Sequence, residues 1–557
     1  MAILENTPKN YSALIQEIES GQVKIPQFQR QFVWERAMSA RLIDSMVKGY
    51  PIGTFIFWRT DEELRAIRNI GNLMLPLQSK GEFVNYVLDG QQRITSIFAA
   101  FKGERIEREN GRIEDYSEIY LDLLANGEDD IVTVNTEQRP SNELIKLREL
   151  LSNDFTLLAS YPEAQREKIS LYQNILRGYN FSVINLKQAS IDVATEVFTR
   201  LNTSGRTLSL FEIMVAKTYD ATRQFDLSEK FLQLRAELAD VHYGDLPAQT
   251  VLQVVSMLLE KEVKRATILK LDKQRFIDTW PEAVSCIKSA IDFFRGYGIP
   301  VLRLLPYATL VVPFAYFFHK HPTPPTGEQL GRLEDFFWRV SLGSRYSSAV
   351  ESKLVQDIKK IDALLRNKQP HYQWTVDVSS EGLVSQGSFS TGRSFVKAIL
   401  CLYAKQHPRS FDSNQTVRID NAWLKVSTSK NYHHFFPIAF MKRSYLGRDY
   451  WSYNHVLNIT IVDDFLNKNR IRAKAPADYM QKFAEENPRL EATMRTHLIG
   501  SLERFGVLEN DYDKFQQARA KRVSKLLSGL LIDQETGQEE QIDDVEEILE
   551  EEISEDA

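Results

Sequence analysis

The sequence predicts an α+β protein that is largely helical and divided into several folding units. Three observations predict this class. Residues 1 to about 225 alternate strand-like and helical patterns, residues 226 to about 380 contain charged amphipathic segments such as "LSEKFLQLRAELADV", and residues 395–500 mix helices with a short β section near 430–465. At about 100–200 residues per domain, 557 residues suffice for about three to five units.

Composition shifts indicate where the units begin and end. We expect a mixed α/β domain at 1–225, a helical domain at 226–385, a second mixed domain at 386–505, a basic helix at 506–532 and a disordered acidic tail at 533–557. The tail holds thirteen Asp or Glu and no Lys or Arg, so the formal charge of −6 leaves +7 for residues 1–532. The tail either solubilises the chain or competes with a polyanion for a basic groove.

Cysteine content and apolar patterning indicate the compartment. The two cysteines, Cys286 and Cys401, exclude a disulfide framework and fit a reducing environment. The start of the chain shows no secretory signal. The longest charge-free run, 304–318, has fifteen residues and contains Pro306 and Pro313, so it predicts a buried helix pair rather than a membrane span. We therefore expect a soluble cytoplasmic protein without a membrane partner.

The elements of the first domain follow in order. Residues 39–49 predict a helix, and 53–59 and 181–186 predict strands. The stretch "NYVLDGQQRITSIFAAF" (85–101) predicts a strand, a turn at Asp89–Gly90 and a helix that Asp89 is able to cap. The helix buries one face, formed by Ile94, Ile97, Phe98 and Phe101.

That helix leaves Gln91, Gln92 and Arg93 on its first turn, where we expect them to be exposed. A cation there opposes the helix dipole by up to about 1 kcal/mol unless an anion lies between them. A bound phosphate would supply that anion, and so would a nearby carboxylate such as Asp89. The sequence alone leaves both interpretations open.

Two further segments carry polar groups beside aromatic or turn residues. In "IPQFQRQFVW" (25–34), Gln29 and Arg30 stand among aromatic residues, which suits recognition of a base but also an edge strand with a buried aromatic face. In "FTRLNTSGRTLSLFEIMVAK" (198–217), Asn202 lies in a turn before a helix that the capping box Ser209–Glu212 opens. No Walker A pattern occurs in the chain.

"IPxFQRxFVW", "YVLDGQQRITS" and "RLNTSGRTLS", in this order, resemble the N-terminal domain of GmrSD-type modification-dependent restriction enzymes, which has a ParB/sulfiredoxin-like core. The resemblance covers about residues 10–220. It implies binding and hydrolysis of an NTP, ATP or another. The nucleotide-site residues that it implies are Asp89, Gly90, Gln91, Gln92, Arg93, Arg30, Gln29 and Asn202.

A second constellation lies in "NYHHFFPIAFMKR" (431–443) and "VLNITIVDDFLNKNRIRAK" (456–474). Adjacent residues of a strand face opposite ways, so His433 and His434 cannot chelate one ion together but can divide two tasks. A histidine pair of this kind is equally compatible with a surface position that has no chemistry. Basic residues flank the segment, as binding of a polyanion requires, and we expect DNA contacts from Lys442, Arg443, Lys468, Arg470, Arg472 and Lys474.

The order strand, His, hairpin, Asn, helix, Asn resembles the His-Me finger (HNH, ββα-metal) nuclease domain that forms the C-terminal half of GmrSD-type enzymes. By this resemblance His434 is the general base, and Asn458 bridges the hairpin and orients it. His433 and Asn467 are metal ligands, with Asn469 as the substitute for Asn467. The expected metal is Mg²⁺ or Mn²⁺.

These resemblances lead to one expected function and two rivals. We expect a type IV restriction endonuclease for phage defence that cleaves double-stranded DNA with methylated, hydroxymethylated or glucosylated cytosine. It would act under the control of an NTPase domain, and the resemblance implies a homodimer. The rivals are a phosphorothioate-sensing nickase of the same architecture, and a nucleotide-switched DNA-binding regulator with an inert HNH domain.

Overall fold

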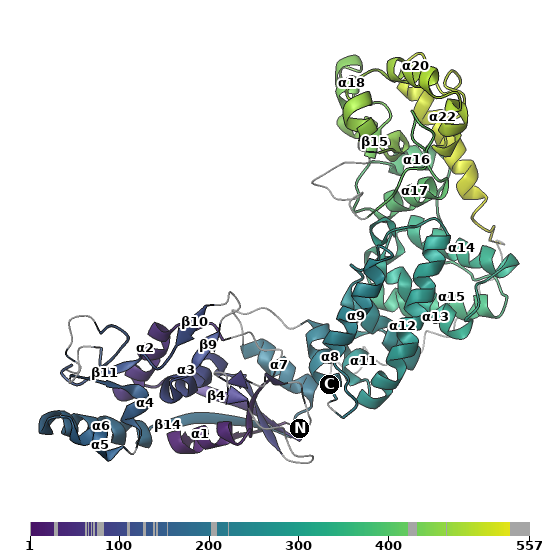
Figure 1. Ribbon diagram of the computed structural model, residues 1–557. Helices are drawn as coiled ribbons and strands as arrows, with labels where there is room; N and C mark the ends of the chain where they lie inside the picture. The colour runs from purple at the N-terminus through teal and green to yellow at the C-terminus, as the bar shows by residue number, and fades with distance from the viewer. Residues whose placement is uncertain are drawn as a thin grey trace. The chain divides into compact units, whose positions relative to one another are not determined.

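The computed structural model describes residues 2–26, 32–61, 64, 66–67, 69–70, 73–74, 83–107, 112–125, 130–136, 140, 143–152, 154–201, 209–220, 222–420, 432–463 and 465–534. The chain forms two compact units (Figure 1). The first comprises 1–233 and 265–279, and the second comprises 234–264 and 280–557. The helical middle and the second mixed region of the sequence are therefore parts of one unit.

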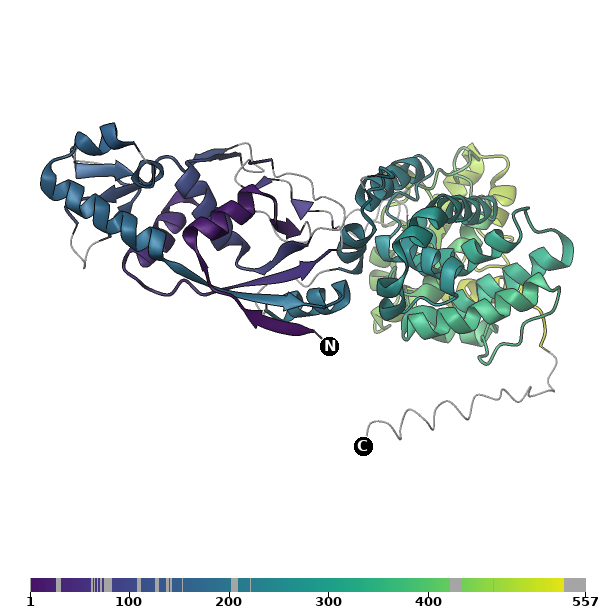
Figure 2. The ribbon, with the colours of Figure 1, turned by 90° about the horizontal axis from the view of Figure 1, so that it is seen from below.

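A mixed sheet is the centre of the first unit. Within the described residues its strand order is β1 (Ile3–Asn6), β14 (Asn180–Lys187), β4 (Thr54–Thr60), β8 (Val84–Asp89), β3 (Val23–Pro26) and β5 (Ala66–Ile67), and β2 (Lys9–Asn10) pairs with β14. The β14–β4 and β3–β8 pairs are parallel, and the other pairs are antiparallel. In Figure 2 the purple β1 lies beside β14.

Alternation along the strands gives this sheet two apolar faces. Phe55, Phe57, Val87 and Val183 pack with α1 (Tyr11–Glu19), α2 (Arg36–Val47), α3 (Gln91–Lys102) and α6 (Glu163–Gly178). Their neighbours Trp58, Tyr86, Leu88 and Leu186 pack with α7 (Ile191–Leu201) and α8 (Leu210–Thr218). Helices therefore cover both faces. The predicted strands at 53–59 and 181–186 and the helix at 39–49 are present.

Small elements complete the first unit. They are β6 (Asn69–Ile70), β7 (Leu73–Met74), β9 (Arg105–Glu107), β10 (Ile113–Asp115), β11 (Tyr120–Asp122), β12 (Val132–Thr133), β13 (Leu144–Lys146), α4 (Leu147–Leu150), α5 (Phe155–Ala159) and α11 (Arg265–Lys270). The capping box of Ser209 and Glu212 is confirmed at the start of α8, and Leu210, Ile213 and Met214 are buried behind it.

Helices dominate the second unit. They are α9 (Leu227–Ala239), α10 (Ala248–Glu260), α12 (Lys273–Gly296), α13 (Val311–Lys320), α14 (Gly327–Leu342), α15 (Val350–Leu365), α16 (Ser380–Gln386) and α17 (Ser394–Lys405), with the first residues of α9 and α12 in the first unit. Where a buried helix pair was predicted, one α-helix, α13, follows two single turns, η2 (Leu302–Leu304) and η3 (Ala308–Leu310). None of the described helices combines the length and apolarity of a membrane span.

The end of the second unit carries the short hairpin that the sequence predicts. Strands β15 (Tyr432–His434) and β16 (Ile459–Ile461) are flanked by α18 (Ile438–Ser444), α19 (Tyr450–Tyr453), η6 (Val456–Asn458), η7 (Leu466–Ile471), α20 (Pro476–Glu486), α21 (Leu490–Thr496) and α22 (Tyr512–Ser528). Phe435, Phe436, Tyr479 and Phe515 are fully or almost fully buried in the core between them. The hairpin therefore rests on an aromatic core.

Candidate active site

The β15–β16 hairpin places the two adjacent histidines on opposite sides. The strands pair antiparallel with His433 opposite Thr460 and His434 opposite Ile459. His433 is 2% exposed and faces the rings of Phe411 and Tyr479, whereas His434 is only partly buried. His433 is therefore an interior residue, whereas His434 lies nearer the surface.

Asn458 fixes the turn that follows His434. Its side-chain Oδ1 accepts from the Phe436 N–H at 2.8 Å, and its Nδ2 donates to the carbonyls of Phe436 (3.0 Å) and Tyr453 (2.9 Å). The side chain is fully buried. Because these backbone bonds engage both ends of the amide, Asn458 acts by positioning the hairpin and does not touch a substrate.

His433 is a neutral imidazole held against one asparagine. Its Nδ1 lies 3.2 Å from Asn467 Oδ1, and Asn467 Nδ2 donates to the Tyr432 carbonyl. Burial lowers the pKa of His433 to about 3, with smaller contributions from the charges of His434 and His497. Its buried Nε2 has no hydrogen-bond partner among the described residues. A neutral ring with one uncommitted nitrogen is suited to metal ligation.

His434 is oriented by a second asparagine. Its Nε2 lies 2.9 Å from Asn454 Oδ1, so Nε2 carries the proton and donates. Burial lowers the pKa of His434, and the contact with Asn454 partly opposes this shift. The bond leaves Nδ1 unprotonated, and no partner of Nδ1 lies in the part of the chain that the structure describes. His434 is therefore a neutral base with a defined tautomer.

Asn454 belongs to the candidate site but was not predicted from the sequence. It lies directly after α19 and also donates from Nδ2 to the Phe389 carbonyl at 3.4 Å. The only signal was a second amide in "YNHVLN", four residues before Asn458. Nothing in that spacing indicates that the chain from α19 to β16 folds back onto His434.

The two candidate metal-binding asparagines take different positions. Asn467 contacts His433, whereas Asn469 is exposed and forms no hydrogen bond with either histidine in the described structure. In this contact Asn467 Oδ1 accepts the proton on His433 Nδ1, so the two atoms, 3.2 Å apart, would hold one hard cation only with that proton moved to Nε2. No cluster of three His, Cys, Asp or Glu side chains suited to a metal occurs among the described residues. A site here would thus have few protein ligands.

The residues that we expect to contact DNA differ in their exposure and in their ion pairing. Lys442, Arg443, Lys468 and Arg472 are exposed, as Lys474 is. Arg470 instead forms a bidentate pair with Glu486, both N–O distances being 2.6 Å, so its charge is neutralised. Arg519, on the basic last helix α22, is completely buried and cannot reach a substrate.

Arg519 is a structural residue of the hairpin. It donates to the carbonyls of Leu457 and Ile459 at 2.7 Å each and to that of His497 at 3.0 Å. The Leu457 and Ile459 carbonyls lie just before and at the start of β16, and the His497 carbonyl follows α21. The helix α22 therefore anchors the candidate site rather than binding DNA through Arg519.

The second candidate site, the Asp89–Arg93 turn, differs from the expectation. Gln91 and Gln92 are buried, at 5% and 7% exposure, and not exposed as predicted. Gln92 Oε1 accepts from the Val33 N–H at 2.9 Å. Gly90 rather than Asp89 is the N-cap, with φ of 95°, and a Cβ there would lie 2.3 Å from the Phe55 ring. The predicted Asp89 cap is therefore wrong.

The Arg93 guanidinium finds its hydrogen-bond acceptors within the protein. Its guanidinium donates to the carbonyls of Ile52 (2.7 Å) and Thr54 (3.0 Å) and to Asp89 Oδ2 (3.0 Å), and it lies over the Phe55 ring. Of the two interpretations, the structure supports the pairing with Asp89 and gives Arg93 no need of a phosphate. The other predicted nucleotide-site residues, Gln29, Arg30 and Asn202, lie outside the described residues.

Comparison with known proteins supports the likeness of the first region. Residues 11–219 match the family model of the GmrSD restriction endonuclease N-terminal domain. The chain is 24% identical to an uncharacterised protein of Methanocaldococcus jannaschii over 531 residues. The aligned region covers 86% of this chain and 88% of that protein. The likeness to the Methanocaldococcus jannaschii protein therefore extends well beyond residues 11–219. The family match indicates a relation to restriction endonucleases.

Proposed function

We propose that this protein is a metal-dependent DNA endonuclease of the type IV restriction class. The observation that carries the proposal is the hairpin on which each histidine has its own asparagine, Asn467 for His433 and Asn454 for His434. The match of residues 11–219 to the N-terminal domain of a restriction endonuclease family supports it independently.

The residues of the hairpin divide the chemistry. His434, neutral and held through Nε2, would accept the proton of an attacking water at Nδ1, while the bond from phosphorus to the leaving sugar oxygen breaks. His433 and Asn467 would hold a divalent cation, Mg²⁺ or Mn²⁺, which when bound supplies positive charge at the phosphate oxygens. Asn458 would hold the turn that follows His434. The exposed cations of α18 and η7 would bind neighbouring phosphates of double-stranded DNA.

The role of the first unit is proposed from the family likeness alone. We propose that it binds and hydrolyses an NTP and thereby controls cleavage. In this proposal Arg93 shapes the Asp89–Gly90 turn through Ile52 and Thr54 and is not itself the phosphate ligand. Gly90 is buried, so the partly exposed Asp89 carboxylate is the part of the turn that a nucleotide could approach.

The test is digestion of a DNA panel with and without NTP. The panel contains unmodified, methylated, hydroxymethylated, glucosylated and phosphorothioated DNA, each incubated with Mg²⁺ or Mn²⁺ and with EDTA. We expect EDTA-sensitive double-strand cleavage of one or more cytosine-modified substrates. Cleavage of phosphorothioated DNA alone would show the nickase rival, and no cleavage under any condition would show an inert hairpin.

A further inference from the structure

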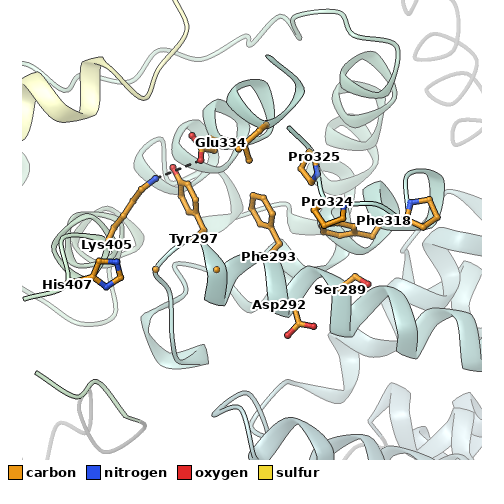
Figure 3. Close-up of a pocket in the computed structure, with 14 residues that line it drawn as sticks. Ser289, Asp292, Phe293, Tyr297, Phe318, Pro324, Pro325, Glu334, Lys405 and His407 are labelled. Carbon is orange, nitrogen blue, oxygen red and sulfur yellow. Dashed lines mark ion pairs between the residues drawn. The ribbon is translucent and has the colours of Figure 1, made fainter. Parts of the chain in front are cut away.

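The second unit contains a cavity of about 680 Å³ apart from the hairpin (Figure 3). This volume is within the range of about 300–1,000 Å³ that small-molecule sites occupy. Six of its fourteen lining residues are aromatic residues or prolines, and Ser289, Asp292, His407 and the Glu334–Lys405 ion pair supply its polar groups. A largely apolar lining with a few polar groups is typical of small-molecule binding sites.

The apolar wall consists of flat side chains. Phe293 of α12 and Tyr297, directly after that helix, stack with ring centroids 5.8 Å apart and planes inclined by 10°. Phe318 lies 6.1 Å from Phe293, and Pro324 and Pro325 lie beside Phe318 in Figure 3. Flat apolar surfaces of this kind favour a planar ring.

A hydrogen-bond acceptor and a donor lie side by side at the other end of the wall. Lys405 Nζ is 3.8 Å from Glu334 Oε1 and 3.5 Å from the centre of the Tyr297 ring. Burial raises the pKa of Glu334 and lowers the pKa of Lys405, so both groups are poorly solvated. The edge of a nucleobase presents the complementary pair, an amino donor next to a ring-nitrogen or carbonyl acceptor.

A second cavity of about 860 Å³ shares Lys405 with the first. Its other cations are Arg495 on α21 and Lys521, Arg522 and Lys525 on α22. Arg495 pairs with Glu491, but the three α22 cations form no ion pair within the described residues. Cations without an ion-pair partner, next to a cavity that could hold a base, are able to bind a phosphate chain.

We propose that the first cavity binds a nucleobase, stacked on Phe293 and read by Glu334 and Lys405, while its phosphates lie along the second. The base would come from an unpaired position in a nucleic acid strand or from a free nucleotide. The proposal deepens the proposed function, since the helices that line these cavities also hold the hairpin: Tyr403 of α17 contacts the Val456 carbonyl, and Arg519 of α22 binds Leu457 and Ile459.

Binding without metal tests this proposal separately from cleavage. Fluorescence anisotropy in EDTA compares a labelled duplex carrying one unpaired cytosine with the fully paired duplex, and dCMP serves as the competitor. The variant Glu334→Met/Lys405→Met replaces the ion pair with apolar groups of similar length. We expect it to bind the unpaired-base duplex about tenfold or more weakly and the paired duplex unchanged. Since no cleavage is measured, an inert hairpin leaves this result unaffected.

The matched control is Glu237→Met/Lys288→Met, an ion pair at 2.6 Å in the same unit that lines neither cavity. We expect wild-type binding from the control, and we expect Lys521→Gln/Arg522→Gln to weaken both duplexes and reduce the salt dependence. Binding of dCMP as tight as that of the unpaired-base duplex would assign the cavity to a free nucleotide. If the Glu334/Lys405 variant binds both duplexes and dCMP as the control does, the proposal is wrong.

Discussion

At the scale of single residues, sequence patterns located the groups but not their partners. The pairing of His433 with Asn467 follows from a strand and a helix that the sequence predicts. The role of Arg93 did not follow, because the carbonyls of Ile52 and Thr54 come from a strand about forty residues away. Propensity and spacing describe a residue's own element, whereas these contacts depend on the order of strands in a sheet.

The structural role of Arg93 gives a stability prediction. Arg93→Ala leaves the Ile52 and Thr54 carbonyls without their donor and Asp89 without its counter-ion, so we expect a loss of about 2–4 kcal/mol in the first unit. Hydrogen exchange of β4 and α3 amides in urea measures this loss. The control is Arg105→Ala, which breaks an exposed pair with Asp115 and costs about 0–1 kcal/mol. An unchanged stability of Arg93→Ala together with lost NTP binding would restore the phosphate interpretation.

At the scale of elements, most of the strongly periodic segments took the predicted form. The burial of Ile94, Ile97 and Phe98 on α3 is an example, because i, i+3, i+4 spacing places them on one face. The Ser- and Gly-rich stretch at 379–394, beside the boundary predicted between 385 and 386, contains α16. Ser379 caps that helix through the Gly382 N–H and Leu383 is buried beneath it. A single buried leucine in a Ser- and Gly-rich stretch gives too little periodicity to reveal a helix from sequence.

The anchoring of β16 by α22 gives a second stability prediction. Arg519→Met removes three hydrogen bonds to buried carbonyls, so we expect the second unit to lose about 3–5 kcal/mol and the hairpin amides to lose exchange protection. Arg522→Met, three residues on along the same helix, should change stability by no more than about 0.5 kcal/mol. Thermal and urea unfolding compare the two variants. Equal losses would mean that the guanidinium of Arg519 does not hold the hairpin.

The histidine that caps η6 gives a pH prediction for the same element. His455 accepts from the Leu457 N–H at Nδ1 and donates from Nε2 to the Val384 carbonyl, and burial together with Arg393 and Arg519 lowers its pKa from 6.5 to about 4. Between these values the unfolded chain binds the proton and the folded chain does not. Stability should therefore fall as the pH falls from about 6.5 to 4, by at most about 3 kcal/mol from this group.

His455→Gln provides the control for that pH dependence. The glutamine amide can donate to the Val384 carbonyl but does not titrate, so the slope of unfolding free energy between pH 4 and 6.5 should become shallower. The buried His433 and His497, with pKa values near 3, would account for the remaining slope. A slope identical to that of the wild type would show that His455 is not neutral in the folded protein.

At the scale of the whole molecule, the sequence predicted the order of the two candidate sites better than the division of the chain. The helical segments after residue 233 and the hairpin region share one unit, because α17 and α22 pack on the hairpin. Composition cannot show this, since the helices look alike whether they form a separate domain or support a neighbour. The acidic tail from residue 535 lies outside the described residues.

The rate of metal-dependent DNA cleavage by His434→Ala tests the central claim most directly. The comparison uses the wild type and Asn469→Ala, an exposed amide on η7 that does not contact His433. Removing a general base should slow single-turnover cleavage by about 10²- to 10⁴-fold, while Asn469→Ala should cleave at the wild-type rate. Equal cleavage by His434→Ala and the wild type would contradict the assignment of the hairpin as the nuclease site.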